Sequence, residues 1–246
     1  MFTIVKIIAL TGILALLGAP AHSEQEEWRY VVQLYGWLPT IDIESEDGTS
    51  SKITADDLID NLDMGFMTSF GVAKGKWRFA TDVLYMDLSN DDGAQISPLL
   101  ELKELALEAW IVAPNVGYEI YASDRQSVNL VVGARYLWLD NTLTLKTTPP
   151  GNLPGSQMKV GDSASKWDAI AGVAGRYRLG EKWLFNYSLN AGAGQSDFTG
   201  QARGAFSYEI SRVDAVLGWR YMTWHLGESV ERLTISGPFV GALFTF

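Results

Sequence analysis

The residues best suited to chemistry in this sequence are ten charged side chains that recur at alternate positions of apolar, strand-like segments. Alternate residues of a β-strand share one face, so these side chains are expected to gather on a single face of a sheet. Guanidinium and carboxylate groups held in a confined space either pair with each other or bind ions of opposite charge. The set predicts a mildly cationic interior and consists of Arg29, Asp82, Glu119, Arg135, Lys166, Asp168, Arg176, Arg203, Asp214 and Arg220.

Two interpretations of this charged face stay open. In the first, the side chains form a structural ion-pair network, because charges in a restricted interior persist only when they are paired. In the second, the arginines line a narrow conduit or a pocket that binds small anions. The first is the simpler interpretation, since a narrow interior has to be filled by side chains and a satisfied polar network does so.

A catalytic centre is a weaker expectation. His225 is the histidine in the strand-rich part of the chain, and Asp87, Asp91 or Asp140 could stand near it as an acid partner. Such a pair needs hydrogen-bond geometry, and nothing in the spacing shows that these residues converge. We therefore expect no catalytic residue. We also expect no metal and no cofactor, because the sequence has no cysteine, no Cys/His cluster and no P-loop.

Ten segments with period-two alternation are expected to position the charged residues. In the third segment, for example, Trp77 and Phe79 lie on the opposite face from Arg78. Short links alternate with longer ones, as in an up-and-down barrel. The seventh and eighth segments nearly meet at 195–199, so a count of eight strands stays possible. The expected strands are 28–40, 64–75, 77–90, 104–121, 127–146, 164–178, 182–196, 199–209, 213–224 and 232–246.

The apolar face of these segments is predicted to point outward, into lipid. Aromatic residues such as Trp77 and Tyr85 lie at the ends of apolar rows, where amphipathic rings favour the boundary between water and lipid. The opposite face mixes small and amide side chains with both signs of charge, which suits a narrow interior. The pattern predicts an all-β, antiparallel, up-and-down transmembrane β-barrel. Its barrel-closing terminal signal is the outward row Val240, Ala242, Phe244 and Phe246.

The amino-terminal residues 1–23 are predicted to be a cleavable secretory signal peptide. Lys6 precedes an apolar run from Ile7 to Ala19, which is too short for a membrane-spanning helix. Residues 24–246 then form one barrel domain. The composition is 47% hydrophobic, yet no later apolar run reaches the about 18 residues of a transmembrane helix. A net charge of −10 argues against nucleic-acid binding.

The segment 41–63 is expected to form a long acidic loop at one end of the barrel. Thr54 can cap a short helix, whose first turn favours acidic side chains. Leu58, Ile59 and Leu62 would then share an apolar side, so we expect one or two helical turns over the barrel mouth.

A calcium site in this segment is disfavoured by its spacing. Gly48 falls one place late for an EF-hand loop, and Ile53 stands where the terminal acid would be. The acids of the segment are Asp42, Glu44, Glu46, Asp47, Asp56, Asp57, Asp60 and Asp63, beside the single base Lys52.

The ending ISGPFVGALFTF and the alternating strands resemble the outer-membrane β-barrel superfamily of Gram-negative bacteria. The stretches YGWLPTIDIE, LIDNLDMGFMTSFGVAKGKWRFATDVLYMDLS and VVGARYLWLD are similar to a widespread group of small uncharacterised outer-membrane barrels within it. The resemblance implies export through the periplasm to the outer membrane. It also implies contacts with outer-membrane lipid and lipopolysaccharide, and recognition of the last strand by the barrel-assembly machinery. We expect a monomer.

Three classes of function stay open, and the resemblance, which carries no assigned substrate, does not decide among them. The first is an integral outer-membrane barrel without a catalytic site, acting as a narrow pore or a barrel that binds a small ligand or anion. The alternative is a structural or surface-interaction barrel that acts through acidic extracellular loops. A rim-active omptin-like protease or a lipid-modifying enzyme is the weakest, because residues 224–229 lack the His-x-Ser spacing of outer-membrane phospholipase and lipid A deacylase barrels.

Overall fold

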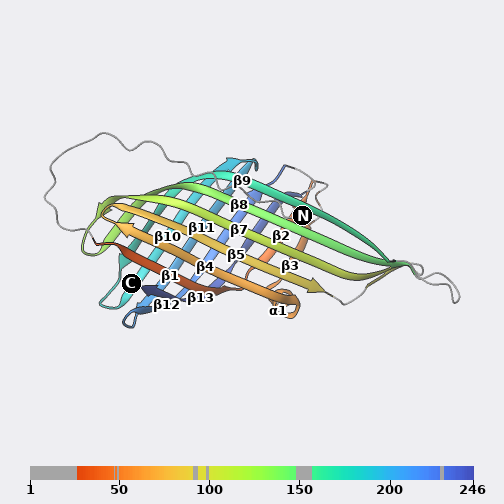
Figure 1. Ribbon diagram of the computed structural model, residues 1–246, viewed down its shortest axis with the longest axis horizontal. Helices are drawn as coiled ribbons and strands as arrows, with labels where there is room; N and C mark the ends of the chain where they lie inside the picture. The colour runs from red at the N-terminus through yellow and green to blue at the C-terminus, as the bar shows by residue number, and fades with distance from the viewer. Residues whose placement is uncertain are drawn as a thin grey trace, which may run out of the picture.

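The computed structural model describes residues 27–246 except 47, 49, 91–93, 98–99, 148–156 and 228–229. The predicted signal peptide 1–23, Asp47 and Asp91 lie outside the described residues. Within the described part, ten strands form a closed antiparallel barrel, which confirms the predicted fold (Figure 1). In order around the wall they are β1 (Arg29–Trp37), β4 (Leu62–Lys74), β5 (Trp77–Asn90), β7 (Leu100–Ala122), β8 (Gln126–Thr147), β9 (Gln157–Arg178), β10 (Trp183–Gly194), β11 (Phe198–Glu209), β12 (Val213–His225) and β13 (Val230–Thr245).

The wall closes where the last strand pairs with the first. The ladder between β1 and β13 runs from Val31 opposite Thr245 to Trp37 opposite Phe239. Phe246 extends this seam, because its N–H donates to the carbonyl of Tyr30 over 2.9 Å and its carbonyl accepts from the Tyr30 N–H over 3.1 Å. Closure leaves no unpaired strand edge along this seam.

Strands β10 and β11 are separate members of the wall. Their ladder runs from Trp183 opposite Tyr208 to Gly192 opposite Thr199, and residues 195–197 join them. The strand count is therefore ten in the described chain, and the alternative of eight strands is wrong.

The two ends of the barrel differ in their connections. At one end, here called the turn end, short links at 75–76, 123–125, 179–182 and 210–212 join neighbouring strands. Gly75 adopts a φ of +55°, a left-handed conformation that a tight hairpin requires and that glycine adopts without a Cβ clash. Longer connections lie at the opposite end, here called the loop end.

The acidic segment folds against the loop end. Strand β2 (Thr40–Ser45) continues along β13 beyond β1, β3 (Ser50–Ile53) pairs with β2, and the helix α1 (Ala55–Asn61) follows. The predicted short helix is confirmed, but its apolar side is narrower than expected. Leu58 is buried, whereas Ile59 and Leu62 are exposed. Within the described residues, no helix has the length and apolar content to cross a membrane.

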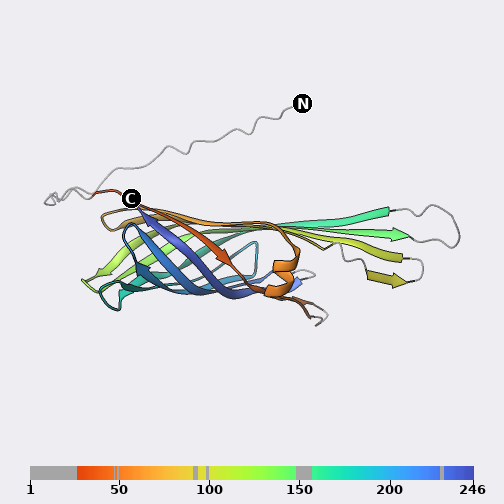
Figure 2. The same cartoon turned by 90° about the horizontal axis from the view of Figure 1, so that it is seen from below.

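Three strands continue past the barrel at the loop end. Strand β7 pairs with β5 only from Leu105 onward, and β9 pairs with β10 only from Asp168 onward. Beyond these points β7, β8 and β9 pair with one another, with β6 (Ala94–Ser97) alongside β7. This extension projects well beyond the other strands (Figures 1 and 2). From Lys166 to Gln157, β9 pairs with β8 and no longer with β10, a stretch of roughly 30 Å at about 3.4 Å per residue.

The outer wall carries an apolar band between two rows of aromatic side chains. Trp77 and Tyr85 lie on β5 about 27 Å apart along the strand, which is about 20 Å along an axis tilted by about 40°. Between the rows Leu217 is 61% exposed and Val132 is 59% exposed, so the apolar face points outward as predicted. The rows are marked by Trp77–Tyr118 and Trp183–Tyr208 toward the turn end and by Tyr85–Trp110 and Tyr136–Trp167 toward the loop end, with ring centroids 4.5–5.0 Å apart.

Candidate functional site

The half of the interior nearer the loop end is filled by apolar side chains, here called the apolar plug. Leu58 of α1 belongs to the same packed cluster and covers it from the loop end. The sequence pattern predicts charged and small polar residues on the inner face, and for this half that prediction is wrong. Each wall residue of the plug is at most 5% exposed; they are Trp37, Leu84, Met86, Ile111, Leu137, Met222, Trp224, Leu233, Ile235 and Phe239.

Three arginines lie directly beneath the plug, on its turn-end side. Each guanidinium faces an aromatic ring of the plug: Arg203 lies 4.6 Å from the Phe239 centroid, Arg220 lies 5.3 Å from that of Trp37, and Arg135 lies 5.7 Å from that of Trp224. A cation over an aromatic face in a desolvated site gains about 2 kcal/mol. With Asp82 and Asp168, these arginines form what we call the arginine layer.

Arg220 and Asp82 form the directly paired part of this layer. Nη2 of Arg220 lies 2.6 Å from Oδ2 of Asp82, and Nη1 donates to the hydroxyl of Tyr35 over 2.9 Å. The hydroxyls of Tyr35 and Ser69 donate to Oδ1 of Asp82 over 2.8 Å and 2.6 Å. One ion pair and two hydrogen bonds to the same carboxylate therefore fix both side chains.

The other two arginines donate to neutral groups. Nη2 of Arg203 donates to the side-chain carbonyl of Gln33 over 2.8 Å. Arg135 is fully buried, and it donates from Nη1 to the Thr199 hydroxyl over 2.7 Å and from Nη2 to the Asn190 carbonyl over 2.5 Å. A buried cation without a carboxylate partner is expensive, because hydrogen bonds to neutral groups only partly replace its hydration.

Asp168 is the second carboxylate of the layer. It lies opposite Arg135 in the ladder between β8 and β9, is 2% exposed, and accepts the Ser196 N–H over 2.8 Å. Among the described residues, no nitrogen of Arg135 lies within ion-pair distance of this carboxylate, 4.0 Å, and the direct ion pair within the layer is that of Arg220 with Asp82. The layer thus holds three cations against two anions.

A cavity of about 180 Å³ lies beside this layer. Its lining includes Asp82, Arg135, Arg203 and Arg220, together with hydroxyl and amide side chains such as Asn190. The Nε–H groups of Arg135 and Arg220 are shielded from solvent and have no acceptor in the structure. The cavity therefore adjoins a net positive charge and donors that lack acceptors.

The turn end of the interior opens into a wider vestibule of about 810 Å³. Two ion pairs lie near it: Arg78 pairs with Glu119 over 2.7 Å, and Arg178 pairs with Glu209 over 2.8 Å. Its other charged lining residues are Arg29, Arg176, Glu181, Lys182 and Asp214. Within the described residues, Arg29 and Arg176 form no hydrogen bond or ion pair, so their charge is available to the vestibule.

The structure distributes the ten charged residues singled out from the sequence over three places. The arginine layer contains Asp82, Arg135, Asp168, Arg203 and Arg220. The vestibule and its rim contain Arg29, Glu119, Arg176 and Asp214. Lys166 lies apart from both groups, opposite the plug residue Leu137 on β8.

Sequence reasoning missed the neutral partners that complete the layer. Their types were visible as polar residues at inward positions of otherwise apolar strands, but their contacts join distant positions. The Arg203–Gln33 bond, for example, spans 170 residues of sequence. The missed residues are Gln33, Tyr35, Ser69, Asn190, Thr199 and Gln201.

At the loop end, the catalytic candidates His225, Asp87 and Asp140 do not form a hydrogen-bonded cluster among the described residues. Nε2 of His225 lies 3.3 Å from Nε of Arg232, which itself pairs with Glu44 over 3.1 Å. Asp87 and Asp140 form no hydrogen bond or ion pair with His225 among the described residues. The same residues contain no group of three or more metal-ligating side chains.

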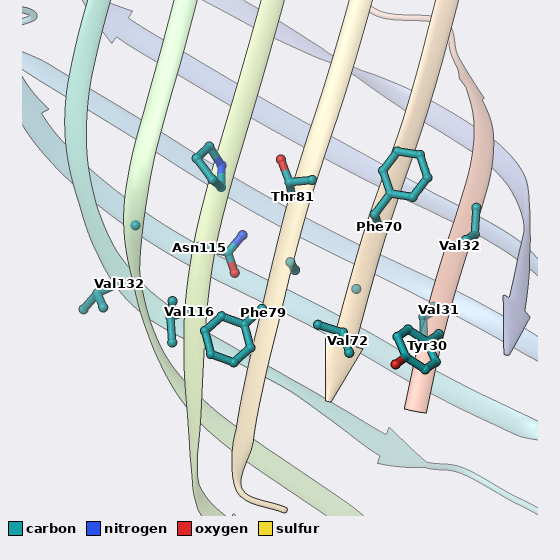
Figure 3. A pocket seen from close by; sticks show the side chains of 14 residues that line it. Tyr30, Val31, Val32, Phe70, Val72, Phe79, Thr81, Asn115, Val116 and Val132 are labelled. Atoms are coloured by element: carbon teal, nitrogen blue, oxygen red, sulfur yellow. The ribbon is translucent and has the colours of Figure 1, made fainter. Parts of the chain in front are cut away.

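The outer wall also bears a shallow apolar hollow of about 630 Å³ across β1, β4, β5, β7 and β8. The side chains of Phe70, Val72 and Phe79 stand on the face of β4 and β5 that points away from the opposite wall (Figure 3). Because it lies on the outer face within the apolar band, this hollow is separate from the interior sites.

The comparisons with known proteins support the fold. No family model and no curated protein matches the sequence. The structure is similar to that of the outer membrane protease OmpT of Escherichia coli, with a TM-score of 0.59, 10% sequence identity, and coverage of 92% of this chain and 99% of that chain. Ail, the attachment invasion locus protein of Yersinia pestis, matches with a TM-score of 0.37, 9% identity, and coverage of 90% and 100%. The chain has the fold of the Gram-negative outer-membrane β-barrels.

Proposed function

We propose that this chain is an integral protein of the Gram-negative outer membrane, with the turn end in the periplasm and the loop end outside the cell. The outward apolar band and its two aromatic rows support the spanning orientation, because such rows mark both boundaries of the hydrocarbon layer. Short turns on the periplasmic side and long connections outside are the usual arrangement in such barrels.

The barrel is a closed platform rather than a channel. The observation that carries this proposal is the apolar plug, which fills the interior toward the loop end with residues such as Trp224 and Met222, both fully buried. A ten-stranded barrel is too narrow to leave a wide aqueous path beside such packing. The parts left to act outside the membrane are the extension and the acidic segment of β2, β3 and α1, which fits a surface-interaction role.

Conductance recordings in planar lipid bilayers test whether the interior is closed. We expect the purified wild-type barrel to give no discrete current steps at neutral pH, while a general porin inserted under the same conditions gives open channels. Reproducible unitary currents from the wild-type protein would overturn the closed-platform proposal and favour the narrow conduit.

Cysteine labelling on intact cells tests the orientation, since the sequence contains no cysteine. Ser163 is exposed on the extension, and Asp124 is exposed in a turn-end link. A membrane-impermeant maleimide is expected to label Ser163→Cys on intact cells and Asp124→Cys only after the outer membrane is opened. The reverse pattern would refute the orientation, and equal labelling of both would refute the membrane-spanning placement.

A further inference from the structure

The arginine layer contains more positive charge than the protein itself neutralises. Three guanidinium groups share the layer with the two carboxylates Asp82 and Asp168. Arg135, Asp168 and Arg220 are buried, whereas Arg203 and Asp82 are partly exposed. Aromatic rings attract the arginines through their quadrupoles, but a quadrupole carries no net charge and leaves the imbalance in place. One positive charge is therefore in excess within the arginine layer.

We infer that the cavity beside Arg135, Arg203 and Arg220 binds one small monovalent inorganic anion, of the size of chloride. An anion of single charge balances the excess, whereas a divalent anion would overcompensate it beside Asp82, which also lines the cavity. The unpaired Nε–H groups of Arg135 and Arg220 supply donors that no protein group uses.

The size of the cavity fits an ion that keeps part of its hydration. A volume of about 180 Å³ is about six times the volume that a molecule occupies in liquid water. The site thus has room for one halide and a few waters held by polar lining groups such as Ser188 and Asn190. Retained water lowers the desolvation penalty of the ion, which would be large in a dry apolar site.

The anion enters from the turn end. The apolar plug separates the cavity from the loop end, and the vestibule lies on the turn-end side of the same interior. Arg29 and Arg176 at the vestibule raise the local concentration of anions, because a charged cleft with low-dielectric walls focuses the field. The site is distinct from the extension, so this inference stands or falls independently of the proposed surface role.

Thermal unfolding in detergent micelles, followed by tryptophan fluorescence, tests the site. The wild-type barrel is melted in sodium chloride and in sodium gluconate of equal ionic strength, since gluconate is a much larger anion than chloride. We expect a saturable stabilisation by chloride. At a hundredfold excess over its dissociation constant, chloride raises the folding equilibrium constant about 100-fold.

Arg135→Gln is the diagnostic variant, because it leaves two cations against two anions in the layer. Its unfolding temperature is expected to be the same in both salts. Arg178→Gln is the matched control, since Arg178 pairs with Glu209 at the exposed rim and its loss leaves the layer intact. This control is expected to keep the full response to chloride.

A bromide-soaked crystal of the wild-type barrel gives a second measurement that does not depend on the folding of any variant. Anomalous scattering is expected to place one bromide in the cavity within contact distance of the guanidinium groups. The inference is overturned if the wild-type barrel melts identically in the two salts, or if the cavity of the bromide-soaked crystal holds only water. Equal loss of the response in both variants would also overturn it.

Discussion

Replacing Asp82 by Asn removes the carboxylate that directly pairs with a buried arginine. The side chains of Arg220 and Asp82 are 2% and 17% exposed, and their closest atoms are 2.6 Å apart. The variant retains the shape of the side chain and an oxygen that can accept from Tyr35 and Ser69. It loses the negative charge, so three guanidinium groups then face the single carboxylate of Asp168.

The expected loss of unfolding free energy follows from the contacts of Asp82. Two hydrogen bonds to a charged acceptor become bonds to a neutral one, a loss of about 1 kcal/mol each. Breaking a buried ion pair by removing one partner costs about 3–5 kcal/mol in all, and the partial exposure of Asp82 places the expected value near the lower end. A loss of about 3 kcal/mol lowers the folding equilibrium constant roughly a hundredfold.

Urea unfolding in lipid vesicles measures this loss as a shift of the unfolding midpoint. Glu209→Gln serves as the matched control, because Glu209 and Arg178 form an ion pair with side chains 34% and 36% exposed. The control is expected to lose at most about 1 kcal/mol. If Asp82→Asn costs no more than the control, the interpretation of the arginine layer as a tightly coupled, water-shielded network is refuted.

Three further predictions concern the plug, the outer wall and the turn end. Trp224→Ala is expected to lose about 3–5 kcal/mol of unfolding free energy in the same urea assay, because the side chain is fully buried in the plug; a loss below 1 kcal/mol would contradict the packing. Leu217→Arg places a cation on the apolar band and is expected to cost about 2–4 kcal/mol of unfolding free energy in bilayers. Ile210→Arg, in a turn-end link, is expected to leave the unfolding free energy nearly unchanged, and equal effects of the two variants would argue against the band. Gly75→Ala is expected to cost about 1–2 kcal/mol from its left-handed φ of +55°, and an unchanged midpoint would show that the turn rearranges freely.

The barrel could be predicted from sequence because its signal is local. Alternation along each strand, as with Trp77, Arg78 and Phe79, identifies the two faces without knowledge of the neighbouring strands. The links at the turn end are short, so strand order followed from chain order. The helix after Thr54 was likewise predicted from its cap and its apolar residues, and α1 confirms it.

The plug was missed because its signal contradicts simple alternation. Near the loop end of β5, Leu84 and Met86 point inward while the intervening Tyr85 belongs to the outer aromatic row, so both faces are apolar. A continuous apolar run does not reveal which residues face the interior. The pairing of β2 with β13 was missed for a related reason, since an acidic segment such as 41–45 carries a weak strand pattern.

The arginine layer was only partly predictable. The sequence indicated that Arg135, Arg203 and Arg220 share the inner face. Which of them pairs with Asp82 depends on the position of each residue along the barrel axis. That position is set by the stagger of the strands. Stagger is a property of the assembled wall, so the excess of positive charge could be located only in the folded structure.

The seam between β1 and β13 has a consequence for how the molecule assembles. The Trp37 indole donates to the carbonyl of Gly237 across 200 positions of sequence, whereas the other wall ladders join strands that are neighbours in the chain. Because this contact closes a long loop, we expect the seam to form after the ladders between strands that are close in the chain, from an open sheet with two unpaired edge strands. We therefore expect the arginines of the layer to stay hydrated until the seam pairs, so that their dehydration accompanies closure of the barrel.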